Sequence, residues 1–246
     1  MTAKNALKRL FRICGLEVRR LRTSNSEYQV LKDVLRASGA QVVVDVGANL
    51  GQFAQLVFEV GFRGTVVSFE AQPDVHRELI RRAAAKSGPA RWVVADCCAL
   101  GSATGTIEMN ISENSLSSSL LPMKREHADA APTSRYVCKK VVKLVRLDDV
   151  AAGVIPADAP LLLKIDTQGY EGEVLKGAEQ VLARSVAVHL ELSLLPLYEE
   201  APSLVELVTY LESRGFELFG LLPVFRDDRD GRLLQVDGIF IRRRPL

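Results

Sequence analysis

The stretch VVVDVGANLGQF, residues 42–53, indicates the fold class of this 246-residue chain. An apolar strand ends in Asp45, and a glycine-rich turn then leads into a helix. Gly47 and Gly51 allow the backbone to approach a ligand closely at the carboxyl end of the strand, where open α/β sheets bind their ligands. The turn has neither the G-x-G-x-x-G spacing of a dinucleotide site nor the lysine of a Walker loop. It therefore favours a small zwitterionic ligand over a phosphate.

Short β-branched runs alternate with helical segments on both sides of this stretch, which is typical of a parallel sheet with crossover helices. We predict strands at 41–46, 65–70, 91–96, 161–166, 186–192, 216–222 and 237–243. We predict helices at 26–38, 52–60, 74–86, 170–184 and 203–214. The last two strands are joined by the charged turn RDDRDGR without a helix, so this pair is expected to be antiparallel. The sequence predicts a mostly parallel α/β sheet.

A segment of irregular composition, residues 97–146, interrupts this alternation. It is rich in serine and alanine and contains strand patterns at 104–111 and 136–146. A long irregular insert in a compact domain is more often functional than accidental, so we expect it to contribute to a binding site. The prediction is one domain over residues 26–246, preceded by a separate segment, residues 1–25.

The N-terminal segment is basic and amphipathic. Residues 1–22 contain seven lysine or arginine residues and one acid, interleaved with Leu7, Leu10, Phe11 and Ile13. As a helix, this segment would present one cationic and one apolar face. Two interpretations stay open: the apolar face packs on the protein's own core, or the helix contacts an anionic membrane surface.

The composition argues against several classes of protein. The net charge of +2 is too small for the protein as a whole to attract nucleic acid electrostatically, so no nucleic-acid partner is expected. The longest stretch without a charged residue, 46–58, contains Gly, Asn and Gln and does not fit a transmembrane helix. The four cysteines, Cys14, Cys97, Cys98 and Cys138, form no C-x-x-C pair, which argues against a zinc site or a disulfide framework. With no secretory signal pattern, we expect a cytoplasmic protein.

Charged and polar residues mark the ends of several predicted strands. Glu70 stands where nucleotide-binding folds place an acid on ribose hydroxyls, and Asp96 stands where an adenine amino group would be bound. The alternatives are a solvated carboxylate for Glu70 and a turn or helix-cap acid for Asp96.

The segment LLLKIDTQGYEGEVLKGA, residues 161–178, places charges inside an apolar strand. Period-two alternation puts Lys164 and Asp166 on one face, and buried charges are costly unless they are paired or used. The next strand carries His189 and Glu191 in the same alternation. Each residue alone could be a buried polar group whose hydrogen bonds are satisfied within the protein. Neighbouring parallel strands, however, would bring Asp166, His189 and Glu191 to one rim. Together they favour a site.

The chain resembles the FkbM family of class I S-adenosylmethionine-dependent methyltransferases. The likeness rests on VVVDVGANLGQF, SFEAQPDVHREL, VVKLVRLDDV, LKIDTQGYEGEVLKGA, HLELSLLPLY and the late DGIFI, and covers about residues 26–243. Gln168 stands where many members have Glu, which removes one candidate carboxylate. The resemblance implies a Rossmann-like, seven-stranded sheet, mostly parallel with an antiparallel last strand and with helices on both faces.

The resemblance also implies a site for S-adenosyl-L-methionine. By the match, Asp45, Gly47, Asn49 and Gly51 surround its methionine portion, Glu70 binds the ribose, Asp96 lies on the adenine side and Asp166 faces the reacting methyl group. Further expected contacts are Ala48, Gln52, Phe53, Ala71 and Cys97. Some sugar O-methyltransferases use Mg²⁺, so a metal is an open question, and its ligands would be Asp166, His189 and Glu191.

The activity implied by the resemblance is methyl transfer to an oxygen. We expect the acceptor to be a sugar hydroxyl of a glycolipid, another glycoconjugate or a secondary metabolite; a polyketide or other small-molecule hydroxyl and a non-catalytic binding module are the alternatives. Asp166 or His189 is the expected base, with Glu191 orienting the imidazole in the second case and Lys164 keeping Asp166 ionised. Acceptor specificity is expected to lie in the insert 97–146 and the loop 223–235.

Overall fold

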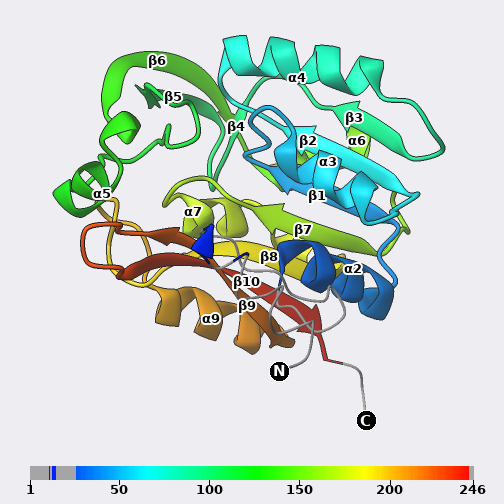
Figure 1. The fold of residues 1–246 in the computed structure, drawn as a ribbon. Helices are drawn as coiled ribbons and strands as arrows, with labels where there is room; N and C mark the ends of the chain where they lie inside the picture. The colour runs from blue at the N-terminus through cyan, green and yellow to red at the C-terminus, as the bar shows by residue number, and fades with distance from the viewer. Residues whose placement is uncertain (1–10, 12, 15–25, 244–246) are drawn as a thin grey trace, which may run out of the picture.

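The main feature of the computed structural model, which describes residue 11, residues 13–14 and residues 26–243, is a seven-stranded sheet (Figure 1). The strands lie in the order β3-β2-β1-β7-β8-β10-β9. Their bounds are β1 (Val42–Val46), β2 (Thr65–Phe69), β3 (Arg91–Val94), β7 (Leu161–Ile165), β8 (Ser185–Ser193), β9 (Phe216–Arg226) and β10 (Leu233–Arg242). β10 pairs antiparallel with β8 and β9, and the other neighbours are parallel. The predicted sheet and its antiparallel end are confirmed.

Helices cover both faces of this sheet (Figure 1). On one face, α2 (Glu27–Ser38) and α3 (Gln52–Glu59) bury Leu31 and Val57 in a cluster with Val43 and Leu162 of the strands. On the other face, the strands pack against α6 (Leu147–Val154), α7 (Glu171–Lys176), α8 (Glu179–Arg184) and α9 (Leu204–Ser213). α4 (Pro73–Ala85) lies beside β3. With both faces covered, the strands read as continuous apolar runs broken only by a few charges.

One predicted helix, 170–184, is two short helices in the structure. The chain turns at Gly177, where a Cβ would lie 1.8 Å from the carbonyl oxygen of Gly101. The carboxylate of Asp148 then accepts from the backbone N–H groups of Gln180 and Val181, at 3.0 Å each, and caps α8. A carboxylate at a helix start satisfies free donors and stabilises the positive end of the dipole, so the helix restarts here. α6 has no counterpart among the predicted helices.

The insert 97–146 forms a second, smaller sheet. Its strands are β4 (Ala99–Leu100), β5 (Gly105–Ser112) and β6 (Tyr136–Val145), in the order β4-β6-β5, and α5 (Arg125–Ala130) and η2 (Pro132–Ser134) precede β6. The two predicted strands of the insert are confirmed. Its loop after β5 reaches the large sheet: Asn49 donates to the hydroxyl of Ser115, and Ser119 donates to the carbonyl oxygen of Gln168. The insert therefore stands beside the carboxyl ends of β1 and β7.

The basic segment, residues 1–22, falls almost entirely outside the described residues, so its interpretation as an amphipathic helix stays a prediction. α2 follows it in the chain and begins after Ser26, whose side chain accepts from the backbone N–H of Gln29. In the part of the chain that the structure describes, no helix is long and apolar enough to cross a membrane.

Candidate active site

The turn after β1 lies very close to two neighbouring strands. Gly47 has a φ of 75°, and a Cβ there would lie 1.9 Å from the carbonyl oxygen of Asp166, just after β7. Gly51 has a φ of 84°, and its Cβ would lie 2.5 Å from the ring of Trp92. Residues other than glycine rarely adopt these angles, and here they would also collide. Because Gly47 has no side chain, the turn can pack directly against the backbone at the carboxyl end of β7.

Glu70 ties this turn to the end of β2. Its Oε2 accepts from the backbone N–H of Asn49 at 2.8 Å, and its Oε1 accepts from that of Gln72 at 2.7 Å. Burial raises the pKa of Glu70, and these backbone hydrogen bonds oppose the rise. Each carboxylate oxygen has two lone pairs, so Glu70 can accept a hydroxyl donor at each oxygen in addition to its backbone partners.

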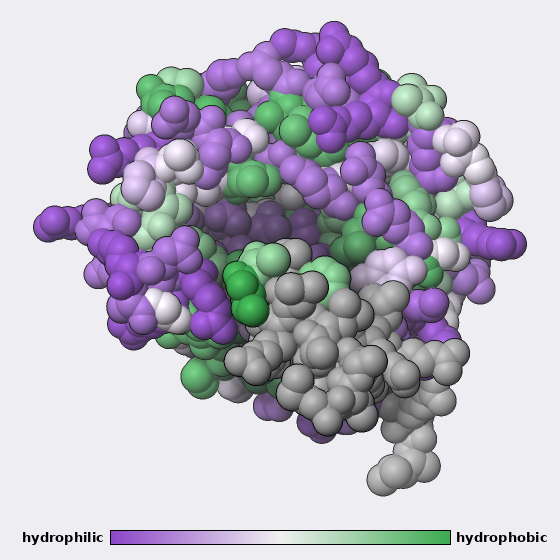
Figure 2. Space-filling view, in the orientation of Figure 1, coloured by the Kyte–Doolittle hydropathy of each residue, from purple (hydrophilic) through white to green (hydrophobic). Residues whose placement is uncertain are grey.

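A cavity lies at the carboxyl ends of β1, β2 and β7. Its polar lining includes Gly47, Asn49, Glu70 and Asp166, and its apolar lining includes Val46, Phe69, Cys98, Leu100, Met109 and Leu120. Serines of the insert close the other side. Figure 2 shows this face hollowed, with hydrophilic residues at the bottom of the hollow. A cavity that combines an apolar slot with a few fixed polar groups suits a small organic ligand such as a nucleoside.

Some predicted contact residues do not reach this cavity, which we call the first cavity. Asp96 is exposed and does not line it, because β3 ends at Val94 and the chain then turns Cys98 inward. The thiol of Cys97 donates to the carbonyl oxygen of Ala71 at 3.4 Å. Among the other predicted contacts, Ala71 lines the first cavity, Ala48, Gln52 and Phe53 line a second one, and Asp45 and Gly51 line neither.

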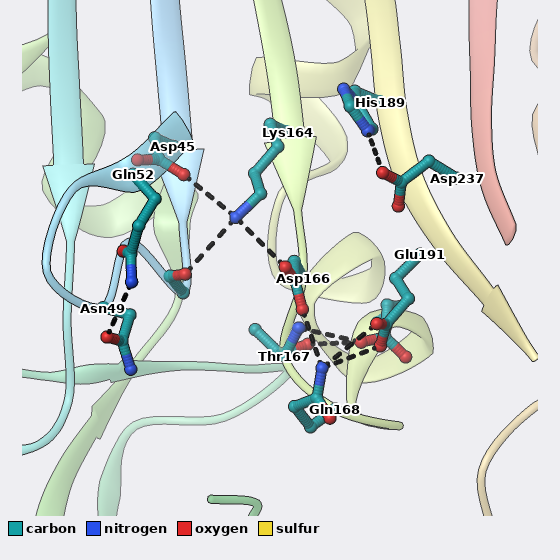
Figure 3. Close-up of polar contacts among 12 residues, drawn as sticks. Asp45, Asn49, Gln52, Lys164, Asp166, Thr167, Gln168, His189, Glu191 and Asp237 are labelled. Atoms are coloured by element: carbon teal, nitrogen blue, oxygen red, sulfur yellow. Dashed lines mark hydrogen bonds and ion pairs between the residues drawn. The ribbon is translucent and has the colours of Figure 1, made fainter. Parts of the chain in front are cut away.

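Lys164 holds two carboxylates at the centre of the sheet (Figure 3). Strand register places it beside Asp45, and its Nζ lies 3.1 Å from Oδ1 of Asp45 and 3.5 Å from Oδ2 of Asp166. Burial alone would lower the pKa of Lys164, but the charges of Asp45 and Asp166 outweigh it and hold the pKa above its ordinary value. The ammonium therefore stays charged and lies within ion-pair distance of both carboxylates.

Gln168 connects Asp166 to Glu191. Its Nε2 donates to Oδ1 of Asp166 at 3.0 Å and to the carboxylate of Glu191 at 3.1 Å, while its Oε1 accepts from the hydroxyl of Tyr198 at 2.7 Å. Burial, together with the charges of Asp166, Glu171 and Asp237, raises the pKa of Glu191 well above its usual range. Tyr198, the last residue of the HLELSLLPLY block, was not among the predicted site residues; it comes from a loop after β8. A glutamate at position 168 could not donate to both carboxylates, so the glutamine is essential to this arrangement.

The partner of His189 is Asp237, and the prediction that Glu191 orients its imidazole is wrong. Nε2 of His189 lies 3.1 Å from Oδ2 of Asp237 on β10. Glu191 lies two residues further along β8, beyond the end of β7, and there it meets Gln168. Asp237 belongs to the DGIFI motif, where it is the charged residue beside an apolar run of β10. That charge is the feature of the sequence that could have indicated a partner for His189.

The expected metal ligands do not form a metal-binding site among the described residues of this rim. Among the described residues, no group of three or more His, Cys, Asp or Glu side chains is arranged to hold a metal ion. Asp166, His189 and Glu191 were the expected ligands, but His189 pairs with Asp237 while Gln168 separates Glu191 from Asp166. The three side chains therefore do not converge on one point.

Glu171 makes a pH-dependent contribution to stability below this rim. Its Oε1 accepts from the backbone N–H groups of Thr167 and Gly169, at 2.8 and 3.1 Å. Burial raises its pKa from 4.5 to about 7, against the effect of the backbone hydrogen bonds. The folded protein therefore keeps a proton on Glu171 at a pH where the unfolded chain has released it.

We expect the free energy of unfolding to fall as the pH rises from 4.5 to about 7, because the unfolded state binds fewer protons in this range. The contribution is fully present below pH 4.5 and is lost above the folded pKa. Glu171→Gln cannot titrate and should remove up to about 1.4 kcal/mol per pH unit from this slope. Urea unfolding across the range measures it, with the exposed Glu217→Gln as control. An unchanged slope in Glu171→Gln contradicts the assignment.

The second cavity adjoins the first at Asp166. Gly47, Asn49, Leu116 and Asp166 belong to the linings of both. The side chain of Asp166 is 38% exposed, whereas that of His189, which lines the second cavity, is 3% exposed. Of the two predicted bases, Asp166 is therefore the one within reach of ligands on both sides.

Comparisons with known proteins identify a family for this chain. The chain matches the model of the methyltransferase FkbM domain over residues 45–218. It is 27% identical to methyltransferase sdnD of Sordaria araneosa over 208 residues, which cover 76% of this chain and 77% of that protein. Among solved structures, an S-adenosylmethionine-dependent methyltransferase of Listeria monocytogenes has a TM-score of 0.50 at 9% identity, covering 89% of this chain and 98% of that one. An rRNA methylase of Streptococcus thermophilus has a TM-score of 0.49 at 13% identity, covering 93% and 100%.

Proposed function

Because the chain belongs to the FkbM methyltransferase family, we propose that it transfers a methyl group from S-adenosyl-L-methionine to a hydroxyl oxygen of a sugar. The family makes it a methyltransferase that uses S-adenosyl-L-methionine. The oxygen nucleophile and the sugar are our proposal, as is a place for that sugar on a glycolipid, another glycoconjugate or a secondary metabolite. The observation that carries it is the half-exposed carboxylate of Asp166 at the junction of the two cavities.

The first cavity fits the cofactor. Glu70 offers free lone pairs for a ribose diol, the apolar lining suits an adenine ring, and Gly47 and Asn49 of the turn line the same cavity, where the methionine portion would lie. Asp166 lines the same cavity and places negative charge near a positively charged sulfur. We propose Gly47, Asn49, Glu70 and Asp166 as the main cofactor contacts.

The chain's own residues position the acceptor and accept its proton. When bound, S-adenosyl-L-methionine would supply a methyl group on a sulfonium, whose neutral thioether, S-adenosylhomocysteine, is a good leaving group. Asp166 faces the second cavity, so its carboxylate can receive a hydrogen bond from an incoming hydroxyl and then its proton. Lys164 and Gln168 fix that carboxylate by an ion pair and a hydrogen bond. A positioned base contributes about 10²–10⁴-fold to the rate.

Methyl-labelled cofactor tests the proposed reaction. A cell-envelope extract is incubated with the protein, and mass spectrometry follows label into sugar-containing compounds that gain one CH₂ unit. Label on a sugar hydroxyl supports the proposal. Label on a polyketide hydroxyl supports the alternative acceptor, and label on nitrogen contradicts oxygen as the nucleophile.

We expect Glu70→Ala to weaken binding of S-adenosylhomocysteine, the demethylated cofactor, by about 1–3 kcal/mol, because charge-assisted hydrogen bonds are lost. Titration calorimetry on the whole chain measures this change. Asp96→Ala is the matched control, since Asp96 is exposed and does not line the first cavity. Equal affinities for Glu70→Ala and the wild type would remove Glu70 from the cofactor site.

We further propose that residues 1–25 form a separate segment ahead of a single domain, 26–246, and that this segment contacts anionic lipid at the inner face of a membrane. Replacing Lys8, Arg9 and Arg12 with glutamine should remove about 1 kcal/mol of attraction per residue. Flotation with anionic vesicles at low salt should carry the wild type and leave the triple variant behind. Wild-type protein that stays at the bottom, or floats equally with zwitterionic vesicles, contradicts this idea.

A further inference from the structure

The second cavity has one apolar wall. It holds about 1290 Å³ of space free of protein atoms, open to solvent on one side. Its apolar side chains are Phe53 and Leu56 of α3, Leu116 of the insert, and Leu222, Pro223 and Val224 of β9. These groups offer no hydrogen bonds, so they suit the C–H face of a ring or an aliphatic portion of a ligand.

The adjoining wall is acidic, and Asp237 on it pairs across the strands with Leu222 of the apolar wall. Glu27, Asp166 and Asp237 line the cavity, and Lys164 is the only cation among its described lining residues. Asp45, which is fully buried beside it, already neutralises Lys164. Among the described lining residues, an anionic ligand would thus meet like charges with no free cation, and like-charge contacts are unfavourable. Ionised carboxylates only accept hydrogen bonds, so this wall suits a ligand rich in hydroxyl donors.

His189 gives this wall a buried polar group as well. Its ring is 3% exposed and packs edge-on against Phe53. Nε2 is held by Asp237, but Nδ1 has no hydrogen-bond partner in the part of the chain that the structure describes. The His189–Asp237 pair fixes the direction of the Asp237 carboxylate, which is 18% exposed and accessible from the cavity.

We propose that the second cavity is the acceptor subsite and that it takes an uncharged, polyhydroxylated sugar ring and rejects rings that carry a carboxylate or phosphate. The ring's C–H face packs on the apolar wall, and its hydroxyl edge donates to Asp237, Glu27 and Asp166. Asp166 then lies at the hydroxyl nearest the first cavity. This inference rests on the proposed sugar O-methylation and adds the charge class of the sugar and the residues that select it.

Methyl NMR of the full chain tests the subsite. Leucine and valine methyl groups are ¹³C-labelled, and the protein is saturated with S-adenosylhomocysteine. We expect methyl β-D-glucopyranoside to shift the signals of Leu56, Leu222 and Val224 saturably. The matched methyl β-D-glucuronide, which has a carboxylate in place of a CH₂OH group, should bind at least about tenfold more weakly.

Variants assign the selectivity to Asp237. Asp237→Asn should weaken binding of the neutral probe by about tenfold and reduce its advantage over the glucuronide. Glu217→Gln, an exposed acid elsewhere on β9, should change neither value. Absence of saturable binding by the neutral probe, equal or tighter binding of the glucuronide, or an unaltered preference in Asp237→Asn each overturns the inference. Failure of the proposed function is read separately, since S-adenosylhomocysteine must shift Leu100 and Leu120 in the first cavity.

Discussion

Replacing Lys164 with methionine is expected to lower the free energy of unfolding by about 3–5 kcal/mol. Its Nζ lies 3.1 Å from Oδ1 of Asp45, whose side chain is 0% exposed. Apart from this ion pair, that oxygen has no partner within the described residues. Without the ammonium, a carboxylate would stay buried and unpaired inside the sheet, and its desolvation would no longer be compensated.

Urea unfolding of the whole chain measures this loss, and two further variants show its origin. Replacing both partners, with Asp45→Leu and Lys164→Met together, should recover most of the stability, because no charge is then left buried. Lys139→Met breaks an exposed ion pair with Glu108 and should have little effect. If Lys164→Met unfolds no more easily than Lys139→Met, the ion pair does not hold the sheet centre.

The sequence predicted the faces of the central strands but not all of their partners. Alternation and the cost of burying charge indicated that Lys164 needs an acid, and Asp166 was the expected one. The structure places Asp45 closer, at 3.1 Å against 3.5 Å for Asp166. Their pairing depends on the register of β1 against β7, which are separated by the whole insert. A slip by two residues keeps every side chain on its face and changes every partner, so periodicity alone cannot decide it.

The dependence on strand register also explains why the sequence predicted the wrong partner for His189. The sequence placed His189 and Glu191 on one face of β8, and their spacing suggested direct contact. In the structure the antiparallel β10 brings Asp237 to the imidazole, and a left-handed residue, Gln168, turns its side chain to Glu191. Antiparallel register and a positive φ are set by tertiary packing. The strands and the antiparallel end followed from local patterns instead.

Replacing Asp166 with asparagine is expected to lower turnover by about 100-fold or more while leaving the affinity for S-adenosylhomocysteine, which lacks the sulfonium charge, nearly unchanged. Asparagine keeps the shape of the side chain and can still accept the hydrogen bond from Gln168, but it cannot take up a proton from the acceptor hydroxyl. Kinetics on the acceptor identified by labelling, together with calorimetry for S-adenosylhomocysteine, separate the two effects.

His189→Gln distinguishes the two candidate bases. His189 is buried and its Nε2 is held by Asp237, so we expect this variant to change acceptor KM more than kcat, whereas Asp166→Asn should change kcat. If the imidazole were the base, His189→Gln would lose turnover as severely as Asp166→Asn. Activity measured after EDTA treatment is a third test, because activity that survives the chelator excludes a metal held by Asp166. Full activity in Asp166→Asn would remove this residue from the mechanism and leave the proton to another group at the junction of the two cavities.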